Sequence, residues 1–185
     1  GGTGGGEVTI SDQIVGIKGF REDLIVFAEN SIHKLVNIND SQNIRIDPIT
    51  ENVGCLSGYS IQEIGGDLVF LAPDGIRTVA GTARIGDVEL GTISRQVQER
   101  FTGLTDVDEF DSVVIPDKTQ YRLFFSDANI TRGNTKGLIA VRKGDTYEYS
   151  DLRGIAPSST DFVTVQGESI ILHGGFDGYV YRQEK

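Results

Sequence analysis

The chain is a series of short apolar runs broken by small polar residues, and this pattern predicts strands almost throughout. Four stretches share one form, an apolar strand, a polar turn and a second strand that alternates apolar and polar positions. They are DLIVFAENSIHKLV (23–36), DLVFLAPDGIRTVA (67–80), QYRLFFSDANITRGNTKGLIAVR (120–142) and SIILHGGFDGYVYR (169–182). Their first residues lie between 44 and 53 residues apart. The chain therefore contains four related predicted hairpins.

Turn chemistry supports these hairpins. The second contains Asp74 and Gly75, and the fourth contains Asp177 and Gly178. Asp-Gly between apolar runs is a strong hairpin signal, because glycine adopts a positive φ without steric cost. We therefore assign these four residues to structural turns. In the third hairpin the turn is longer and spans about 129–136.

Each hairpin is preceded by a further predicted strand, and two are followed by one. The preceding strands are IVGIKGF (14–20), YSIQEIGG (59–66), SVVIPDK (112–118) and FVTVQGE (162–168), and the following ones are NIRIDPI (43–49) and TYEYSD (146–151). A unit of about 40 to 50 residues built from four strands has the period of a β-propeller blade. Because such a blade leaves its faces uncovered, neighbouring blades must stack.

These observations predict an all-β fold, a β-propeller of about four or five four-stranded blades that forms a single domain over 7–185. EVTIS (7–11) is expected to complete the last blade and close a ring of four. An irregular β-sandwich of unrelated hairpins is the alternative. One segment departs from the strand pattern: TISRQVQERF (92–101) has apolar residues at helical spacing. It predicts one short helix between blades that packs against the propeller.

Composition is consistent with one globular domain. The 185 residues are 38% hydrophobic and 24% charged, which is the composition of a folded chain. The opening GGTGGG (1–6) is expected to be a flexible leader outside the fold. The absence of methionine suggests an excised or processed fragment.

Charge and cysteine content exclude several classes of function. The net charge of −10 and the sequence pI of about 4.6 disfavour direct binding to nucleic acid. No apolar run approaches the roughly 20 residues of a membrane span. A single cysteine, Cys55, rules out an internal disulfide and a multi-cysteine zinc site. We expect this thiol to be buried.

The sequence offers little catalytic chemistry. Its two histidines, His33 and His173, would be neighbours in a closed four-blade ring, where a metal or acid–base pair is conceivable. Hydrogen-bonded or solvated histidines are the favoured interpretation. The sequence contains no HExxH, GxSxG, P-loop or paired-cysteine motif. We therefore assign no catalytic, cofactor-binding or metal-binding residue and expect a protein that is not an enzyme.

Two other groups of residues are candidate binding sites. The acidic run TDVDEFDS (105–112) supplies oxygen ligands of the kind that calcium prefers, but it lacks the glycine of an EF-hand turn. A solvated linker between blades is the favoured interpretation. Tyr179 and Tyr181 alternate along the last strand, where a packed face is favoured over a pair that stacks on a glycan.

Several blocks of the sequence resemble structural proteins of tailed bacteriophages, most strongly over 51–101. The matching residues are Gly54-Cys55, Ser60-Ile61, Gly65-Gly66, Phe70 to Gly75, Ile93 to Val97, QYRLFFSD (120–127) and GGFDGYVYR (174–182). These proteins include propeller-bearing nozzle or tail-tube components of phage tails and virion proteins of cyanobacterial phages. None of the shared motifs is catalytic.

The resemblance implies a non-enzymatic component of a phage virion, made in the host cytoplasm and located in the tail. Its partners would be other tail or virion proteins. A homo-oligomeric ring of the full-length protein is a further possibility. No cofactor, specific nucleic acid or membrane is implied. An acidic surface that lines a channel would let DNA slide past. The alternative function is a carbohydrate-binding or carbohydrate-cleaving propeller, such as a lectin or a receptor-binding tail protein.

Overall fold

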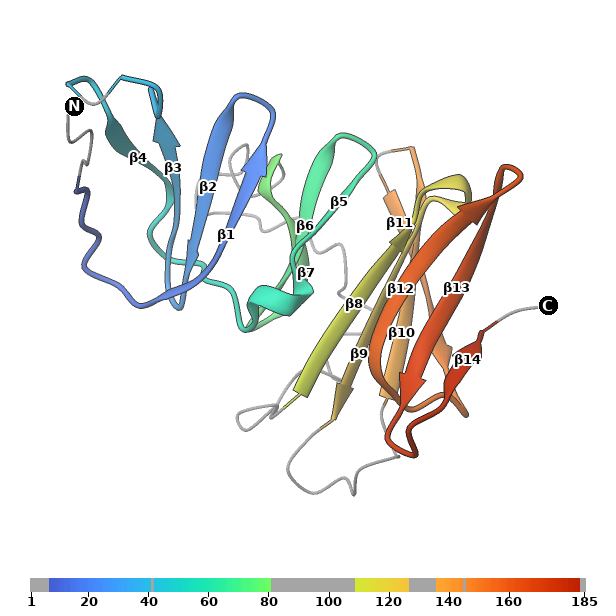
Figure 1. Cartoon of the computed structure of the whole chain (residues 1–185). Helices are drawn as coiled ribbons and strands as arrows, with labels where there is room; N and C mark the ends of the chain where they lie inside the picture. Colours follow the sequence, from blue (N-terminus) through green and yellow to red (C-terminus); the bar gives the residue numbers. More distant parts are fainter. Residues whose placement is uncertain (1–6, 41, 81–108, 127–135, 145, 184–185) are drawn as a thin grey trace.

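The fold is all-β and consists of four small antiparallel sheets that follow one another along the chain (Figure 1). The computed structural model describes residues 7–40, 42–80, 109–126, 136–144 and 146–183. Within these ranges each sheet is a simple meander, in which every strand pairs with the strand that follows it. We number the sheets 1 to 4 in chain order.

The bounds of the elements follow the apolar runs of the sequence. Sheet 1 contains β1 (Ile14–Phe20), β2 (Asp23–Ala28), β3 (Ile32–Val36) and β4 (Arg45–Thr50). Sheet 2 contains β5 (Gln62–Ile64), β6 (Asp67–Ala72) and β7 (Gly75–Thr78). Sheet 3 contains β8 (Glu109–Ile115), β9 (Gln120–Ser126), β10 (Lys136–Lys143) and β11 (Thr146–Leu152). Sheet 4 contains β12 (Pro157–Val165), β13 (Glu168–Gly175) and β14 (Val180–Arg182).

The predicted units correspond to these four sheets, so the all-β prediction is confirmed. Two short 3₁₀ helices replace parts of predicted strands: η1 (Gly58–Ser60) lies just before β5, and η3 (Pro116–Lys118) lies between β8 and β9. Proline at the first position of η3 explains the second case, because it cannot donate a ladder hydrogen bond. The predicted helix at 92–101 and almost all of the long turn at 129–136 lie outside the described residues.

The prediction that EVTIS (7–11) completes the last blade is wrong. Residues 7–10 form no strand, and β14 is the edge strand of sheet 4. Asp12, the residue after EVTIS, instead binds the turn between β2 and β3. Its Oδ2 accepts hydrogen bonds from the backbone N–H of Asn30 and the hydroxyl of Ser31, both at 2.8 Å. The N-terminal segment is thereby tied to sheet 1.

Successive sheets stack face to face, and the alternation of side chains along each strand explains how. In β6, Leu68 and Phe70 are buried in the cluster shared with sheet 1, whereas Val69 and Leu71 are buried in the cluster shared with sheet 3. In β9, Leu123 faces sheet 2 in the same way. A strand covered on both faces needs an unbroken apolar run, which is why these strands contain LVFLA (68–72) and LFF (123–125).

The series of sheets does not return to its start. Figure 1 shows sheet 1 and sheet 4 at opposite ends of the arrangement, so they do not close on each other and the number of blades stays a prediction. His33 lies in β3 of sheet 1 and His173 in β13 of sheet 4. The prediction that the two histidines are neighbours is therefore wrong, because it required a closed ring.

The link between sheet 1 and sheet 2 depends on a close backbone contact. The backbone N–H of Cys55 donates to the carbonyl of Ala28 at 2.9 Å. A Cβ at Gly54 would lie 1.8 Å from the carbonyl oxygen of Glu29. Only glycine fits at this distance, so the Gly54-Cys55 step fixes how the chain passes from one sheet to the next.

Candidate functional site

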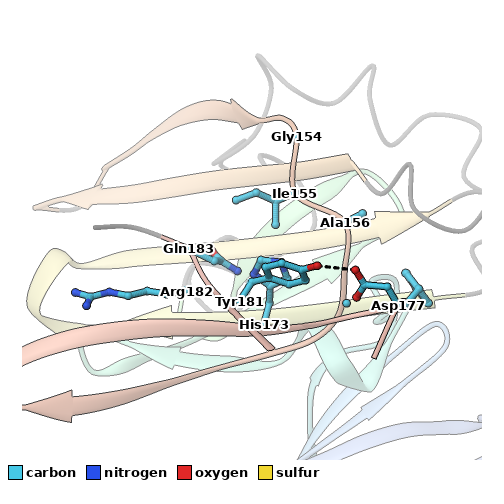
Figure 2. Close-up of a pocket in the computed structure, with 10 residues that line it drawn as sticks. Gly154, Ile155, Ala156, His173, Asp177, Tyr181, Arg182 and Gln183 are labelled. Atoms are coloured by element: carbon cyan, nitrogen blue, oxygen red, sulfur yellow. Dashed lines mark hydrogen bonds between the residues drawn. The ribbon is translucent and has the colours of Figure 1, made fainter. Parts of the chain in front are cut away.

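A pocket of about 420 Å³ opens in the C-terminal part of the molecule, where β13 and β14 meet the link between β11 and β12 (Figure 2). One wall is formed by Gly154 to Ala156 of this link. The other wall carries the polar and aromatic side chains His173, Asp177, Tyr181, Arg182 and Gln183.

Strand register brings the aromatic side chains of the pocket together. His173 pairs with Tyr181 across β13 and β14, so their side chains lie on the same face. The two rings stack at 5.2 Å between centroids and at 22° between planes. The hydroxyl of Tyr181 donates to Oδ2 of Asp177 at 2.5 Å, as Figure 2 shows. These three side chains form a connected group, which we call the His–Tyr–Asp group.

The turn before β14 fixes the position of Asp177. Gly178 has a φ of +86°, and its N–H donates to the carbonyl of Gly175 at 3.2 Å. The N–H of Tyr179 donates to Oδ1 of Asp177 at 3.2 Å. A Cβ at Gly175 would lie 2.4 Å from the same oxygen. Asp177 and Gly178 thus lie in a tight turn, and this turn also orients a carboxylate at the rim of the pocket.

The hydrogen bond within the group sets its protonation. The Tyr181 hydroxyl lowers the pKa of Asp177, and the same bond raises the pKa of Tyr181. Burial lowers the pKa of His173, although the nearby Asp177 opposes this effect. At neutral pH the group therefore contains a carboxylate, a neutral phenol and a neutral imidazole. Nδ1 of His173 and Nε2 of Gln183 are buried without a hydrogen-bond partner among the described residues.

This arrangement suits binding better than catalysis. Aromatic rings beside a carboxylate can contact the apolar face and the hydroxyls of a sugar. Glycoside hydrolysis uses two carboxylates across the scissile bond, and Asp177 is the one carboxylate among the described residues that line the pocket. Within the described ranges, no group of three potential metal-ligating His, Cys, Asp or Glu side chains is found.

The other predicted turn has a different local structure. Pro73 and Asp74 join β6 to β7, and Gly75 is the first residue of β7 with a φ of +130°. Asp74 forms an ion pair with the buried side chain of Arg77, whose Nε donates to Oδ1 at 2.7 Å. This pair was not predicted from the sequence, although the spacing Asp-x-x-Arg across a turn is a usable signal.

Two further candidates are structural. Cys55 is buried, as predicted, and burial raises the pKa of its thiol to about 11; the thiol donates to the carbonyl of Ser57 at 3.2 Å. The prediction of a solvated acidic linker is wrong at Asp111, which lies in β8 and accepts a hydrogen bond from the hydroxyl of Thr160 in β12 at 2.5 Å. Residues 105–108 of that cluster lie outside the described ranges.

A second candidate site is the face of sheet 1 that points away from sheet 2, which we call the front face. Ile25 and Phe27 of β2 are buried against sheet 2, so alternate positions and their cross-strand partners lie on the front face. These residues are Ile14, Ile17, Gly19, Leu24, Val26, Ala28, His33, Leu35, Ile46 and Pro48. Ile14 and Ile17 of β1 are 52% and 55% exposed, whereas Val26 and Ala28 of β2 are buried. This apolar surface was not predicted from the sequence.

The face of sheet 4 that points away from sheet 3, the back face, has an apolar centre with charged residues around it. Ile171 of β13 and Phe162 of β12 face sheet 3, which leaves the alternate residues on the back face. They are Ser159, Asp161, Val163, Val165, Glu168, Ile170, Leu172, Gly174, Val180 and Arg182. Val163 and Val165 are each 46% exposed, and Val180 is 73% exposed.

Comparisons with known proteins give little guidance. No protein-family model and no curated protein matches the chain. Among solved structures, the chain is similar to the computationally designed Ika4 protein, with 14% identity, a TM-score of 0.46, and coverage of 94% of this chain and 92% of that one. It is also similar to one chain in the structure of a Saccharomyces cerevisiae Dbp5 variant bound to Nup159, a Gle1 variant, IP6 and ADP, with 9% identity, a TM-score of 0.39, and coverage of 97% of this chain and 64% of that one.

These TM-scores are too low to define the fold or the function of the chain. Within the described ranges, no helix has the length and apolar character that a membrane span requires.

Proposed function

We propose that this chain is a non-enzymatic structural module, an arc of β-propeller blades that serves as an assembly part of a bacteriophage tail. The observation that carries the proposal is the stack of four meander sheets, with apolar residues exposed on its front and back faces. A module that buries apolar surface between its sheets and presents more at both ends is suited to assembly.

The contacts between first strands support a propeller arrangement of the sheets. β8, the first strand of sheet 3, contacts the first strands of its two neighbours, β5 and β12. β1, the first strand of sheet 1, contacts η1 just before β5. In a propeller, equivalent strands of successive blades lie side by side around the central axis. Blades of three or four strands agree with the sheets observed.

Hydrogen bonds between the sheets support a rigid scaffold. The turn between β5 and β6 is held from both sides, because Arg21 of sheet 1 donates to the carbonyl of Gly66 at 3.2 Å and Arg142 of sheet 3 donates to that of Gly65 at 2.5 Å. The carboxylate of Asp117 accepts a hydrogen bond from the side chain of Ser169 in sheet 4. These polar side chains connect neighbouring sheets and do not converge on a cleft.

The phage setting is supported by the sequence resemblance over 51–101. The described residues of this segment have structural roles. Gly54 permits the close contact with Glu29, and the ring centroid of Phe70 lies 5.3 Å from that of Phe27 between sheets 1 and 2. Partners would be other tail or virion proteins. The test is mass spectrometry of gradient-purified particles of the phage that encodes the chain. Peptides at a ring-like copy number support the proposal, and absence from clean particles contradicts the virion role.

Glycan binding is a second candidate function, favoured by the His–Tyr–Asp group at the pocket. A titration with mono- and oligosaccharides, followed by NMR chemical shifts, tests it. Saturable shifts at His173 that disappear in Tyr181→Ala would support this function. Tyr59→Ala is the matched control, because Tyr59 is 74% exposed and lies outside the pocket. No saturable shift with any saccharide would remove the candidate.

A further inference from the structure

We infer that the back face of sheet 4 binds the front face of sheet 1 in a second copy of this chain, so that copies continue the stack head to tail. The inference rests on the proposed assembly role and names the partner. Its evidence is a comparison of the two covered sheets with the two end sheets.

Sheets 2 and 3 show where a strand with apolar residues on both of its faces lies in this fold. In β6, residues Leu68 to Ala72 are all fully buried, because sheet 1 covers one face and sheet 3 the other. The central strands of the end sheets have the same kind of sequence, LIVFA in β2 and IIL in β13. An antiparallel sheet with one face in water normally alternates apolar and polar residues. β2 and β13 therefore carry the pattern of strands that are covered on both faces. In one copy the front-face residues Val26 and Ala28 of β2 are already buried, and the apolar side chains left exposed on this face are Ile14 and Ile17 of β1.

The pattern in β12 is more specific. Thr164 shares a face with Phe162, the residue that packs toward sheet 3, whereas Val163 and Val165 point to the back face. The two valines are each 46% exposed. At this end of the strand the face away from the protein core is the more apolar one. Such a distribution is unfavourable in water, and it is explained if the back face is buried in an assembly.

The order of the sheets selects the partner. Each sheet has an earlier face, which points toward the preceding sheet, and a later face, which points toward the following sheet. At each of the three internal interfaces, the later face of one sheet packs on the earlier face of the next. The back face is the later face of sheet 4, and the front face is the earlier face of sheet 1. A second copy placed on the back face through its own front face therefore repeats the existing relation between sheets. Such a heterologous contact leads to a closed ring when the rotation between copies closes.

The distribution of charge on the back face agrees with an interface. Val163 and Ile170, which are directly paired, lie between Asp161, Glu168 and Arg182 on the same face. On the front face, His33 is the titratable residue among the strand positions identified above. An apolar centre with charged groups around it is the usual anatomy of a protein interface.

Two charge-introducing variants of the full chain test the inference. Ile17→Lys changes the front face, and Val163→Lys changes the back face, at side chains that are already half exposed in one copy. Light scattering and sedimentation should show an oligomer for the unchanged chain. Each variant alone should dissociate at least about a hundredfold more readily, because a lysine is buried without a partner. Gln42→Lys, at an exposed loop residue, adds the same charge outside both faces and should leave the oligomer intact.

Mixing the two variants distinguishes a head-to-tail contact from other modes. The Ile17→Lys copy keeps an intact back face, and the Val163→Lys copy keeps an intact front face. An equimolar mixture should therefore form a 1:1 dimer through one intact interface and stop there. A contact between two identical faces would instead leave one variant self-associated. That result, or an oligomer unaffected by both variants, would overturn the inference.

Failure of the inference and failure of the proposed function are separable. A chain that stays monomeric at high concentration but is present in purified particles would overturn self-assembly and support a different tail protein as the partner. A chain that forms the 1:1 mixed dimer but is absent from particles would support the head-to-tail contact and contradict the virion role. Thermal unfolding by circular dichroism should show that both variants remain folded.

Discussion

Sheets 2 and 3 differ from sheets 1 and 4 in what covers them, although their central strands have similar sequences. Phe70 of sheet 2 is fully buried, while Val163 of sheet 4 is 46% exposed. Both residues lie in strands with apolar residues on two faces. The comparison teaches that the apolar pattern of a strand indicates the surroundings for which it is suited. One copy covers both faces of the middle sheets but covers the outer faces of the end sheets only in part: Val26 and Ala28 of β2 are buried, whereas Ile17 and Val163 are about half exposed.

The first prediction contrasts truncation in a covered sheet with truncation at an end. Phe70→Ala should lower the free energy of unfolding by about 3–5 kcal/mol, because it removes a buried ring and leaves a cavity between sheets 1 and 2. Val163→Ala should change the stability of a single copy by less than about 0.5 kcal/mol. Urea titration followed by circular dichroism measures both, under dilute conditions that keep the chain monomeric. Equal effects would mean that the ends are covered within one copy.

The second prediction concerns the passage from sheet 1 to sheet 2. Gly54→Ala should cost about 3 kcal/mol, the upper part of the usual range for overpacking, because the new Cβ would meet the rigid carbonyl of Glu29. Gly19→Ala is the matched control, since nothing lies within 4 Å of a Cβ there. It should be neutral or slightly stabilising. Thermal unfolding of the two variants tests the difference, and similar melting temperatures would contradict the close contact.

The third prediction removes one hydroxyl between the two middle sheets. The hydroxyl of Tyr121, a fully buried residue in sheet 3, donates to the carbonyl of Ser60 at 2.8 Å. Tyr121→Phe leaves this buried acceptor without its partner and should cost about 1–3 kcal/mol. Tyr179→Phe makes the same change at a residue that is 67% exposed, so it should have little effect. Denaturant unfolding tests both, and a neutral Tyr121→Phe would show that Ser60 finds another donor.

Local pattern was sufficient to predict the strands, because each hairpin carries its own signal. β1 has the predicted bounds 14–20, and the Asp74-Gly75 turn lies between two apolar runs. Closure of the ring was not predictable in this way, since it depends on the angle between sheets that are distant in sequence. EVTIS (7–11) alternates like a strand, but it could pair with β14 only if sheet 4 returned to sheet 1.

The candidate sites depend on strand register, which explains why single residues of these sites, but not their arrangement, were predicted from the sequence. Tyr181 was noted with Tyr179, but its stacking partner His173 depends on how β13 pairs with β14. The apolar front and back faces depend on which side of β2 and β13 is covered. The unbroken runs LIVFA and IIL were visible in the sequence, but a run alone does not tell whether the second cover comes from the same copy.

The last prediction uses two carboxylates with opposite pKa shifts, one between sheets 3 and 4 and one at sheet 1. Burial raises the pKa of Asp111, although the bonds from Thr160 oppose this shift. The folded state therefore holds the proton more tightly than the unfolded chain, and stability is lost as pH rises through the raised pKa. Asp111→Asn removes this loss and should raise the melting temperature slightly at pH 7, with a smaller difference near pH 3.

Asp12 should show the reverse behaviour. The hydrogen bond from Ser31, followed by that from the Asn30 backbone, lowers the pKa of Asp12. Its contribution to stability is therefore present above the ordinary pKa of an aspartate and is lost as pH falls through the lowered value. Asp12→Asn should lower the melting temperature at pH 7, and the difference should shrink in acid. Calorimetry from pH 3 to pH 7 measures both variants; differences of the same sign would contradict the contrast between a buried contact inside the stack and an exposed tie at its end.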